Sequence, residues 1–309
     1  MIYEYALEPE LVATWGSVQN YRYFLREFGL GKGRLVSRYP KAWIKKVWNA
    51  YDGASQMDRK RLEELLVRFK ETMVKRKDCG WDDHVDGWLE NALIEHGRYP
   101  FRAILARNNT ENLPQIICED ALTISPCQNW DAPHGITVNR KAPEMTAAIE
   151  TMLSLCRWVK FIDPHISPGK FNYKISLQAF LTILNKNRPT GPPEAVEIHT
   201  GMHGATTDYL KDSFEKFIPA GLSVALFQWQ EKPSGQKLHN RYILTDLGGV
   251  SFHHGLDAGA DGETDDITRL DREQYLIHCK QYDTASPAFD QAAVPMTIIG
   301  IHSGRDSGH

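Results

Sequence analysis

The segment KLHNRYILTDLGGVSFHHGLD, residues 237–257, decides the fold class, because ionisable groups interrupt a run that is otherwise typical of buried sheet. Side chains two positions apart on a strand point to the same face, so we expect His239 and Arg241 to project together from one strand. Asp246 follows this strand directly before Leu-Gly-Gly, where we expect a tight hairpin turn. The sequence therefore predicts a histidine beside a guanidinium at the end of a sheet.

The second half of the segment, VSFHHGLD, adds further polar residues. After a hairpin the returning strand lies beside the outgoing one, so His253, His254 and Asp257 should reach the rim where His239 and Arg241 lie. A guanidinium binds the nonbridging oxygens of a phosphate, and an imidazole attacks phosphorus or transfers a proton. The pattern is typical of a site for phosphate chemistry.

The sequence beyond residue 135 alternates between short apolar runs and longer amphipathic stretches. Strands that alternate with helices of this length indicate a sheet covered by helices on both faces. We therefore expect an α/β domain with a mixed sheet over residues 136–309. Its strands are expected in WVKFIDPHI, AVEIHTG, LSVALFQWQ and the opening segment, and its helices in APEMTAAIETMLSLCR, ISLQAFLTILNKN and TTDYLKDSFEKFI.

Residues 1–135 are expected to form a mainly helical, basic region, strand-like only from FRAILARNN through LPQIICEDAL. The first 80 residues contain 16 Lys and Arg against 10 Asp and Glu, whereas the rest of the chain contains 20 against 29. In the helical stretch RYPKAWIKKVWNAY, Lys41, Lys45 and Lys46 are therefore candidate contacts to nucleic acid. The same helix could instead dock through its tryptophans and leave the lysines in water.

Composition narrows the class of protein. The hydrophobic fraction is 42% and the charged fraction 24%, as in an ordinary globular protein. No apolar run approaches the roughly 18 residues that span a bilayer, and MIYEYALEPE lacks the features of a secretion signal. The five cysteines show no CxxC spacing, which favours reduced thiols over disulfides or a zinc ribbon. We expect a cytoplasmic protein that is not inserted in a membrane.

The spacing of His239, Arg241 and Asp246 resembles the signature of the phospholipase D superfamily, which is His-x-Lys, four residues and then Asp. In that family a Gly/Ser-rich segment ending in Asn comes next, and here HHGLD takes its place, with Asp257 at the position of the Asn. The resemblance covers residues 136–309, about one lobe of such an enzyme. Arg241 replaces the family lysine by a permanently charged planar fork that cannot donate its proton as an ammonium can.

The resemblance implies a reaction that needs neither metal nor cofactor. His239 would attack phosphorus to form a phosphohistidine, and a second histidine would protonate the leaving oxygen and then activate water. Since the family takes its two histidines from two lobes, a chain with one motif implies a homodimer with the site at its two-fold axis. The alternative is that His253 or His254 supplies the second imidazole within one chain.

A downstream carboxylate orients the nucleophilic histidine in this family. Here the candidates are Asp266, Asp271 and Glu273, of which we favour Glu273. The His-x-Arg arrangement with a Gly-Leu-Asp segment is also similar to the phospholipase-D-like domain at the C-terminus of certain MIT proteins, which is regarded as a membrane-binding module. This second resemblance supports a role without catalysis.

Two functions are consistent with these residues. The first is a phosphodiesterase that cleaves nucleic acid, DNA in preference to RNA, in a process such as anti-phage defence. Nucleic acid is favoured over phospholipid because we find no lipid-facing amphipathic stretch with a broad apolar side. The alternative is a noncatalytic module that binds an anionic ligand or a partner protein as a scaffold.

A metal site is a further alternative. His165, His199 and His203 follow apolar strands, where the site loops of α/β sheets gather. Together with His253 and His254 they could ligate zinc or manganese. The absence of an HxxxH helix and of paired-aspartate spacing favours the metal-free hypothesis, in which His165 is a secondary site candidate.

Overall fold

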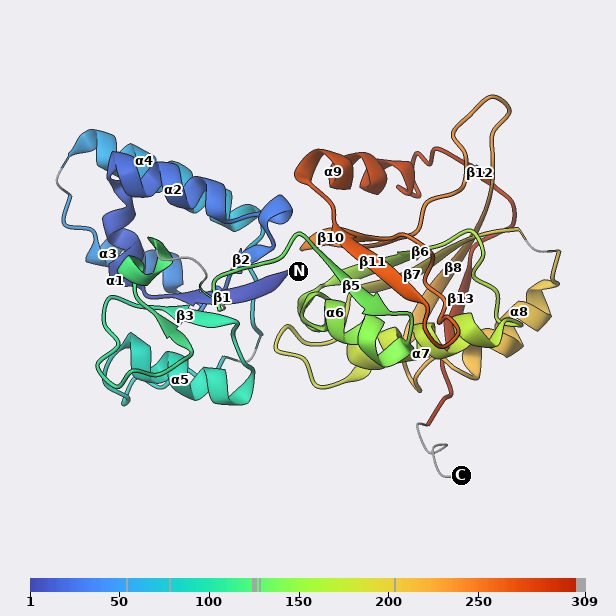
Figure 1. Cartoon of the computed structure of the whole chain (residues 1–309), viewed down its shortest axis with the longest axis horizontal. Helices are drawn as coiled ribbons and strands as arrows, with labels where there is room; N and C mark the ends of the chain where they lie inside the picture. The colour runs from blue at the N-terminus through green and yellow to red at the C-terminus, as the bar shows by residue number, and fades with distance from the viewer. Residues whose placement is uncertain (54, 78, 124–126, 128, 203, 304–309) are drawn as a thin grey trace. The chain divides into compact units, whose positions relative to one another are not determined.

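The computed structural model describes residues 1–309 except 54, 78, 124–126, 128, 203 and 304–309. The chain divides into two units, each with its own sheet (Figure 1). The N-terminal unit comprises residues 2–133 and 189–191, and the C-terminal unit comprises the remainder of the chain. The division falls beside the boundary expected after residue 135, with the short segment 189–191 as an exception.

The N-terminal unit is built on a parallel sheet whose described strands have the order β2-β1-β3-β4. The strands are β1 (Tyr3–Leu7), β2 (Arg34–Val36), β3 (Ala103–Leu105) and β4 (Ile116–Ile117). The helices are α1 (Pro9–Ala13), α2 (Val18–Glu27), α3 (Trp43–Ala50), α4 (Gln56–Glu71) and α5 (Trp88–Arg98), with 3-10 turns η1 (Thr14–Gly16), η2 (Leu30–Lys32) and η3 (Glu119–Thr123). The region expected to be mainly helical thus has a sheet at its centre.

Alternate residues of β1 face two separate hydrophobic cores. Tyr5 and Leu7 pack in a core that also contains residues of α1 to α4. Ala6 packs in the second core, with Trp88 and Ala92 of α5. Because successive side chains of a strand point to opposite faces, helices α1 to α4 cover one face of the sheet and α5 covers the other.

A buried ion cluster links this sheet to α5. Arg76 donates from Nη2 and Nε to Glu4 of β1 at 2.7 and 3.0 Å, and from Nη1 to Glu95 of α5 at 2.8 Å. The three side chains are no more than 1% exposed. A buried charge is tolerated only when it is paired, so the cluster specifies how α5 docks on β1.

The C-terminal unit contains a mixed sheet, which has nine strands within the described residues. The order is β12-β8-β7-β6-β9-β10-β11-β5, and β13 also pairs with β8. Strands β6, β7 and β8 are parallel, and the remaining pairings are antiparallel. The strands are β5 (Gly135–Asn139), β6 (Trp158–Ile162), β7 (Ala195–Gly201), β8 (Ser223–Gln230), β9 (Tyr242–Thr245), β10 (Gly248–Phe252), β11 (Thr264–Arg269), β12 (Asp290–Gln291) and β13 (Met296–Ile299).

Helices cover both faces of this sheet, and the α/β fold predicted from the sequence is confirmed. They are α6 (Ala142–Leu155), α7 (Phe171–Asn185), α8 (Thr207–Glu215) and α9 (Arg272–Gln281). Figure 1 shows α9 on one face and α6 and α7 on the other. Among the described residues, none of the helices combines the length and apolar character that crossing a membrane requires.

The β9–β10 hairpin turns at Asp246 and Leu247, and the two glycines open β10. A Cβ on Gly249 would lie 2.7 Å from Leu244 Cδ2 and 2.9 Å from Leu270 Cδ1. Glycine at this position therefore leaves room for the side chains of Leu244, Leu270 and, on α9, Tyr275. The predicted hairpin is present, with its turn at the residues before the glycines.

Candidate functional site

A pocket of about 460 Å³ lies where β6 and β10 end and β9 begins. Ile162, at the end of β6, pairs with Tyr242, at the start of β9, and Phe252, at the end of β10, donates its N–H to the Arg241 carbonyl at 3.0 Å. The loops that follow β6 and β10 therefore meet the segment that precedes β9. This pocket, hereafter the Arg241 pocket, is lined by Arg140, His165, Lys170, Phe171, Asn172, Tyr173, Arg241, His254 and Asp257.

Asp163 is the buried anchor of the Arg241 pocket. Its Oδ1 accepts the N–H of His165 at 2.8 Å, and its Oδ2 accepts the N–H of Leu256 at 3.0 Å and the hydroxyl of Tyr173 at 3.2 Å. The carboxylate thereby joins the loop after β6, the loop after β10 and the start of α7. Burial raises the pKa of Asp163, although these N–H donors and Arg241 oppose the shift.

Arg241 lies beside this carboxylate and lines the pocket. Its Nε is 4.0 Å from Asp163 Oδ2, and its side chain is 28% exposed. The Nε atom is buried and has no hydrogen-bond partner among the described residues. A guanidinium with an unused buried N–H at an open pocket is well suited to bind an anionic oxygen.

Gly255 lets the HHGLD segment pass between two carboxylates. Its φ is +150°, and a Cβ there would lie 2.6 Å from Asp257 Oδ1 and 3.2 Å from Asp163 Oδ2. Asp257 Oδ1 also accepts from Arg140 Nη2 at 2.8 Å, while Arg140 Nη1 pairs with Glu263 at 2.9 Å. Asp257 therefore lines the pocket as one half of an ion pair.

Two histidines reach the Arg241 pocket, and both His165 and His254 are exposed. The backbone N–H groups of His253 and His254 each donate to Oδ1 of the buried Asp265 at 3.0 Å. The two rings meet edge to face with their centroids 4.9 Å apart. Asp265 thus fixes the turn that presents His254, whereas His253 is not among the lining residues.

His239 does not line the pocket with Arg241. The strand β9 begins at Tyr242, so His239 and Arg241 precede it, and the expectation that they share a face of one strand is wrong. His239 is exposed and interacts electrostatically with Glu231. A hydrogen bond from Lys237, then the N–H of Leu238 and the charge of His239, lower the pKa of that glutamate.

Asp246 lies at the opposite end of β9 from Arg241. Five residues of extended chain separate the two positions by roughly 16 Å. Its Oδ2 accepts from Arg157 Nε at 3.0 Å and its Oδ1 from the Arg157 N–H at 2.8 Å. The predicted placement of Asp246 in the site is therefore wrong, and its observed contacts tie the hairpin turn to the start of β6.

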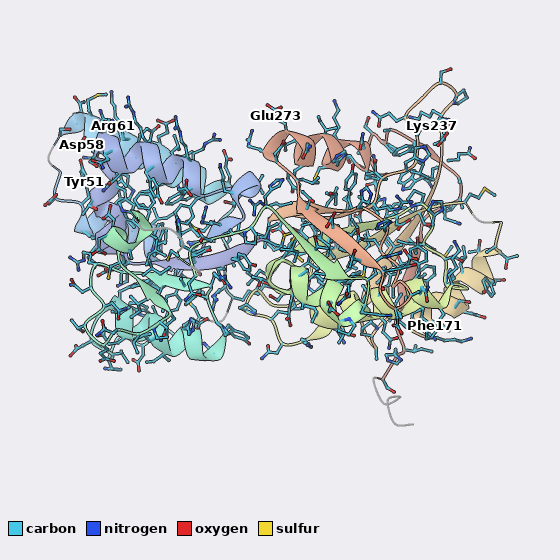
Figure 2. The ribbon with its side chains drawn as sticks, viewed as in Figure 1. Tyr51, Asp58, Arg61, Phe171, Lys237 and Glu273 are labelled. Carbon is cyan, nitrogen blue, oxygen red and sulfur yellow. The ribbon has the colours of Figure 1, made fainter. Side chains whose placement is uncertain are left out.

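Glu273 is also remote from the pocket. Strand β11 runs antiparallel to β10, so the chain that leaves β11 and enters α9 is at the other end of the sheet. Figure 2 shows Glu273 on α9 and the pocket residue Phe171 on opposite sides of the C-terminal unit. Of the other candidates, Asp271 caps α9 and Asp266 accepts a hydrogen bond from Thr137. The orienting role expected of Glu273 is thus not supported by position.

Sequence patterns did not point to three residues that line the pocket, Arg140, Lys170 and Tyr173, or to its buried anchor Asp163. Asp163 could have been identified as a site candidate, because it directly follows the apolar run WVKFI. Polar residues at the carboxyl ends of such strands often belong to functional sites. No sequence pattern distinguishes Arg140 and Lys170 from the many other cations of ordinary surface loops.

The lysines proposed as nucleic-acid contacts lie on or beside α3 in the N-terminal unit. The helix docks through Trp43, whose Nε1 donates to the Leu7 carbonyl at 2.6 Å. Lys41 and Lys45 are exposed, and Lys46 Nζ lies 4.4 Å from the centre of the Trp81 ring. The tryptophan-docked arrangement is present, and contact of the lysines with nucleic acid stays a prediction.

The metal alternative gains no support from the described residues, which contain no group of three His, Cys, Asp or Glu side chains able to hold an ion. His199 is buried, and its ring nitrogens are bound to Trp229 Nε1 at 3.0 Å and Glu197 Oε2 at 2.9 Å. A ring with both nitrogens engaged cannot also ligate a metal. His203 lies outside the described residues.

Comparison with models of known protein families and with curated proteins finds no match for this chain. The resemblance to the phospholipase D superfamily therefore rests on the residues themselves.

Proposed function

We propose that the Arg241 pocket binds a phosphodiester of nucleic acid and hydrolyses it by a phospholipase-D-type reaction. The observation that supports this proposal is the presence of three cationic side chains and two imidazoles around one open pocket. These are the groups that hold nonbridging phosphate oxygens and transfer protons.

The charges around the Arg241 pocket favour the binding of an anion. Arg140 is held by Asp257 and Glu263, so its charge is largely compensated. Lys170 is exposed, and Arg241 has its unused Nε 4.0 Å from the buried Asp163 without a hydrogen bond to it. A bound phosphate would supply acceptors to Lys170 and Arg241.

The proposed reaction has two balanced steps. In the first, a neutral imidazole nitrogen forms a bond to phosphorus, the phosphorus–oxygen bond to the leaving alcohol breaks, and a second imidazolium gives its proton to that oxygen. In the second, the now neutral second imidazole takes a proton from water, which attacks phosphorus and breaks the phosphorus–nitrogen bond. The products are an alcohol and a phosphomonoester.

Two histidines compete for the nucleophile. The family spacing assigns it to His239, whereas His254 lines the pocket and is the alternative nucleophile, with His165 as its proposed second imidazole. His239→Ala and His254→Ala distinguish these assignments. Loss of cleavage in only one of them identifies the nucleophile, and unchanged cleavage in both contradicts the proposed reaction.

The experiment uses labelled single-stranded DNA, double-stranded DNA, RNA and a generic phosphodiester, each with EDTA present. Cleavage that resists EDTA and disappears with Arg241→Ala supports the proposal. His134→Ala is the matched control, since this histidine is exposed and contributes only its backbone carbonyl to the fold. Activity that EDTA abolishes would instead support the metal alternative.

Nucleic acid is the proposed substrate class because the first 80 residues carry the positive charge excess described above. DNA is expected to be cleaved in preference to RNA. A role in anti-phage defence is part of the same proposal and would appear as loss of phage resistance in cells that express Arg241→Ala.

A noncatalytic phosphate-binding module is the second candidate. No ring nitrogen of His165, His239, His253 or His254 has a hydrogen-bond partner in the described part of the chain. A nucleophilic imidazole is usually oriented by such a partner, as in catalytic triads. Binding of oligonucleotides without turnover would support this function.

A homodimer is the other source of a second imidazole. The Arg241 pocket already contains two histidines from one chain, so a monomer has two imidazoles for the proposed reaction. Light scattering should give twice the chain mass of 35.2 kDa if the two-fold arrangement is correct. In that arrangement each site takes His239 from both chains, so an excess of His239→Ala chains mixed with unmodified chains should suppress cleavage, whereas an active monomer would contradict the dimer.

A further inference from the structure

The N-terminal parallel sheet has a topological switch point between β1 and β3. From β1 the chain continues to β2 on one side, and from β3 it continues to β4 on the other. The segments that leave these adjacent strands therefore diverge and open a crevice at their carboxyl ends. Parallel α/β sheets bind their ligands in this position.

A cavity of about 470 Å³ occupies this crevice. Its polar lining consists of Glu10 and Thr14, which follow β1, Arg107, which follows β3, and Lys46, Asn49 and Asp52 from α3 and the residues after it. The volume is that of an ordinary small-molecule site. Every lining residue belongs to the N-terminal unit, so this cavity is distinct from the Arg241 pocket.

One carboxylate oxygen in the cavity lacks a donor. Glu10 Oε2 is buried and has no hydrogen-bond partner among the described residues. Leaving a buried acceptor unsatisfied is costly, so such atoms in native proteins call for an explanation. Hydroxyl groups of a ligand would supply the missing donor, as acidic residues at switch points do for a ribose.

Two cations of the cavity are fixed in place. Arg107 donates its backbone N–H, Nε and Nη2 to Glu8 at 2.6, 3.1 and 3.0 Å. Lys46 Nζ rests on the Trp81 ring. Both are therefore pre-positioned, and a phosphate group would accept from Lys46 and from Arg107 Nη1, which the bonds to Glu8 do not use.

We propose that this cavity binds a mononucleotide, with its sugar hydroxyls at Glu10 and Asp52 and its phosphate at Lys46 and Arg107. The carboxylates and the cations of one crevice match the two polar parts of such a ligand. A free amino acid has the same charges but would fill only a minor part of the volume.

Isothermal titration calorimetry of the full chain with AMP and ATP tests the proposal, with ribose 5-phosphate and inorganic phosphate as partial ligands. We expect saturable binding of a nucleotide, weaker binding of ribose 5-phosphate, and an affinity about tenfold or more lower in Glu10→Gln. Asp52→Asn, at an exposed position, should also weaken binding without affecting the fold. The matched control Glu63→Gln, exposed on α4, should bind as the unmodified chain does.

Arg241→Ala separates this site from the proposed nuclease. It should leave nucleotide binding unchanged while removing phosphodiester binding. The proposal is overturned if neither nucleotide binds at millimolar concentration, if Glu10→Gln and Asp52→Asn bind with unchanged affinity, or if Arg241→Ala abolishes binding.

Discussion

Asp163 joins three chain segments through one carboxylate, and its replacement tests whether the Arg241 pocket depends on it. Asp163→Asn exchanges one acceptor oxygen for an amide that would face a donor, either His165 N–H or the Leu256 N–H and Tyr173 hydroxyl. We expect the free energy of unfolding to fall by about 1–3 kcal/mol, as for other buried donors left unsatisfied. Urea denaturation at pH 7 measures it, and an unchanged midpoint would contradict the anchoring role.

The stability deficit of Asp163→Asn should also depend on pH. Burial raises the pKa of Asp163 in the folded chain above its unfolded value, which is about 3.9. Above that value the unfolded state loses the proton before the folded state does, so the stability contributed by Asp163 falls as pH rises. The deficit should therefore shrink between pH 4 and the folded pKa. A deficit that grows with pH would show that the folded pKa of Asp163 lies below the unfolded value.

Gly255 provides a steric test of the same pocket. In Gly255→Ala the new methyl group meets Asp257 and Asp163 and the backbone is held at positive φ, so we expect a loss of about 2 kcal/mol or more and weaker phosphate binding. Gly97→Ala on α5 is the matched control, because its Cβ meets nothing within 4 Å and alanine favours a helix. Thermal melting should separate the two variants, and equal midpoints would contradict the argument.

Sequence patterns identified some pocket residues and missed others for physical reasons. Arg241, His254 and Asp257 were found because a hairpin brings its two ends together. His239 was misplaced because strand alternation was extended back to this residue, three positions before β9 begins at Tyr242. Asp163 comes from a different strand, and pairing between distant strands is not encoded in local spacing.

At the level of the strands, a buried polar network crosses β6, β7 and β8. The ring of His199 of β7 lies nearly parallel to the rings of Phe227 and Trp229 of β8, with its centroid 4.9 and 5.9 Å from theirs. Trp229 donates to Nδ1, so the proton is on Nε2 and is donated to Glu197, which also pairs with Lys160 of β6 at 2.9 Å. Burial, and secondarily Lys160, lowers the pKa of His199, while Glu197 opposes the shift.

This network predicts acid sensitivity of the sheet. Since the folded pKa of His199 lies below its unfolded value of about 6.5, the unfolded chain binds the extra proton first as pH falls. We expect the free energy of unfolding to decrease from pH 7 to pH 5, and His199→Gln to reduce this slope. His134→Gln, at an exposed site, should keep the slope of the unmodified chain. Equal slopes in all three proteins would contradict the assignment.

Strands β6, β7 and β8 of the C-terminal unit were predictable because they form apolar runs between helical patterns, whereas β5, β11, β12 and β13 were not predicted. Strands β1 and β2 were not, for the opposite reason. They are five and three residues long, and β1 is almost wholly buried without polar alternation. A short buried run of this kind cannot be told from a helix segment by periodicity alone.

At the scale of the whole molecule, the charge asymmetry predicts how nucleic acid is bound. If the N-terminal region contributes through Lys41 and Lys45, affinity should fall with salt as counterions are released from the phosphates. Each lost phosphate contact lowers the slope of log K against log salt by about 0.9 for duplex DNA. Lys41→Ala/Lys45→Ala should therefore bind more weakly and with a shallower slope, measured by fluorescence anisotropy.

The matched control for this prediction is Lys216→Ala, which removes an exposed lysine of the C-terminal unit outside the Arg241 pocket. It should keep the original slope. If the double variant and the control behave alike, while Arg241→Ala abolishes binding, nucleic acid is held by the C-terminal unit alone. Each lysine that contacts a phosphate adds to the slope of log K against log salt, as well as to the affinity. The slopes measured for these variants therefore show whether one unit or both units contribute to the binding free energy.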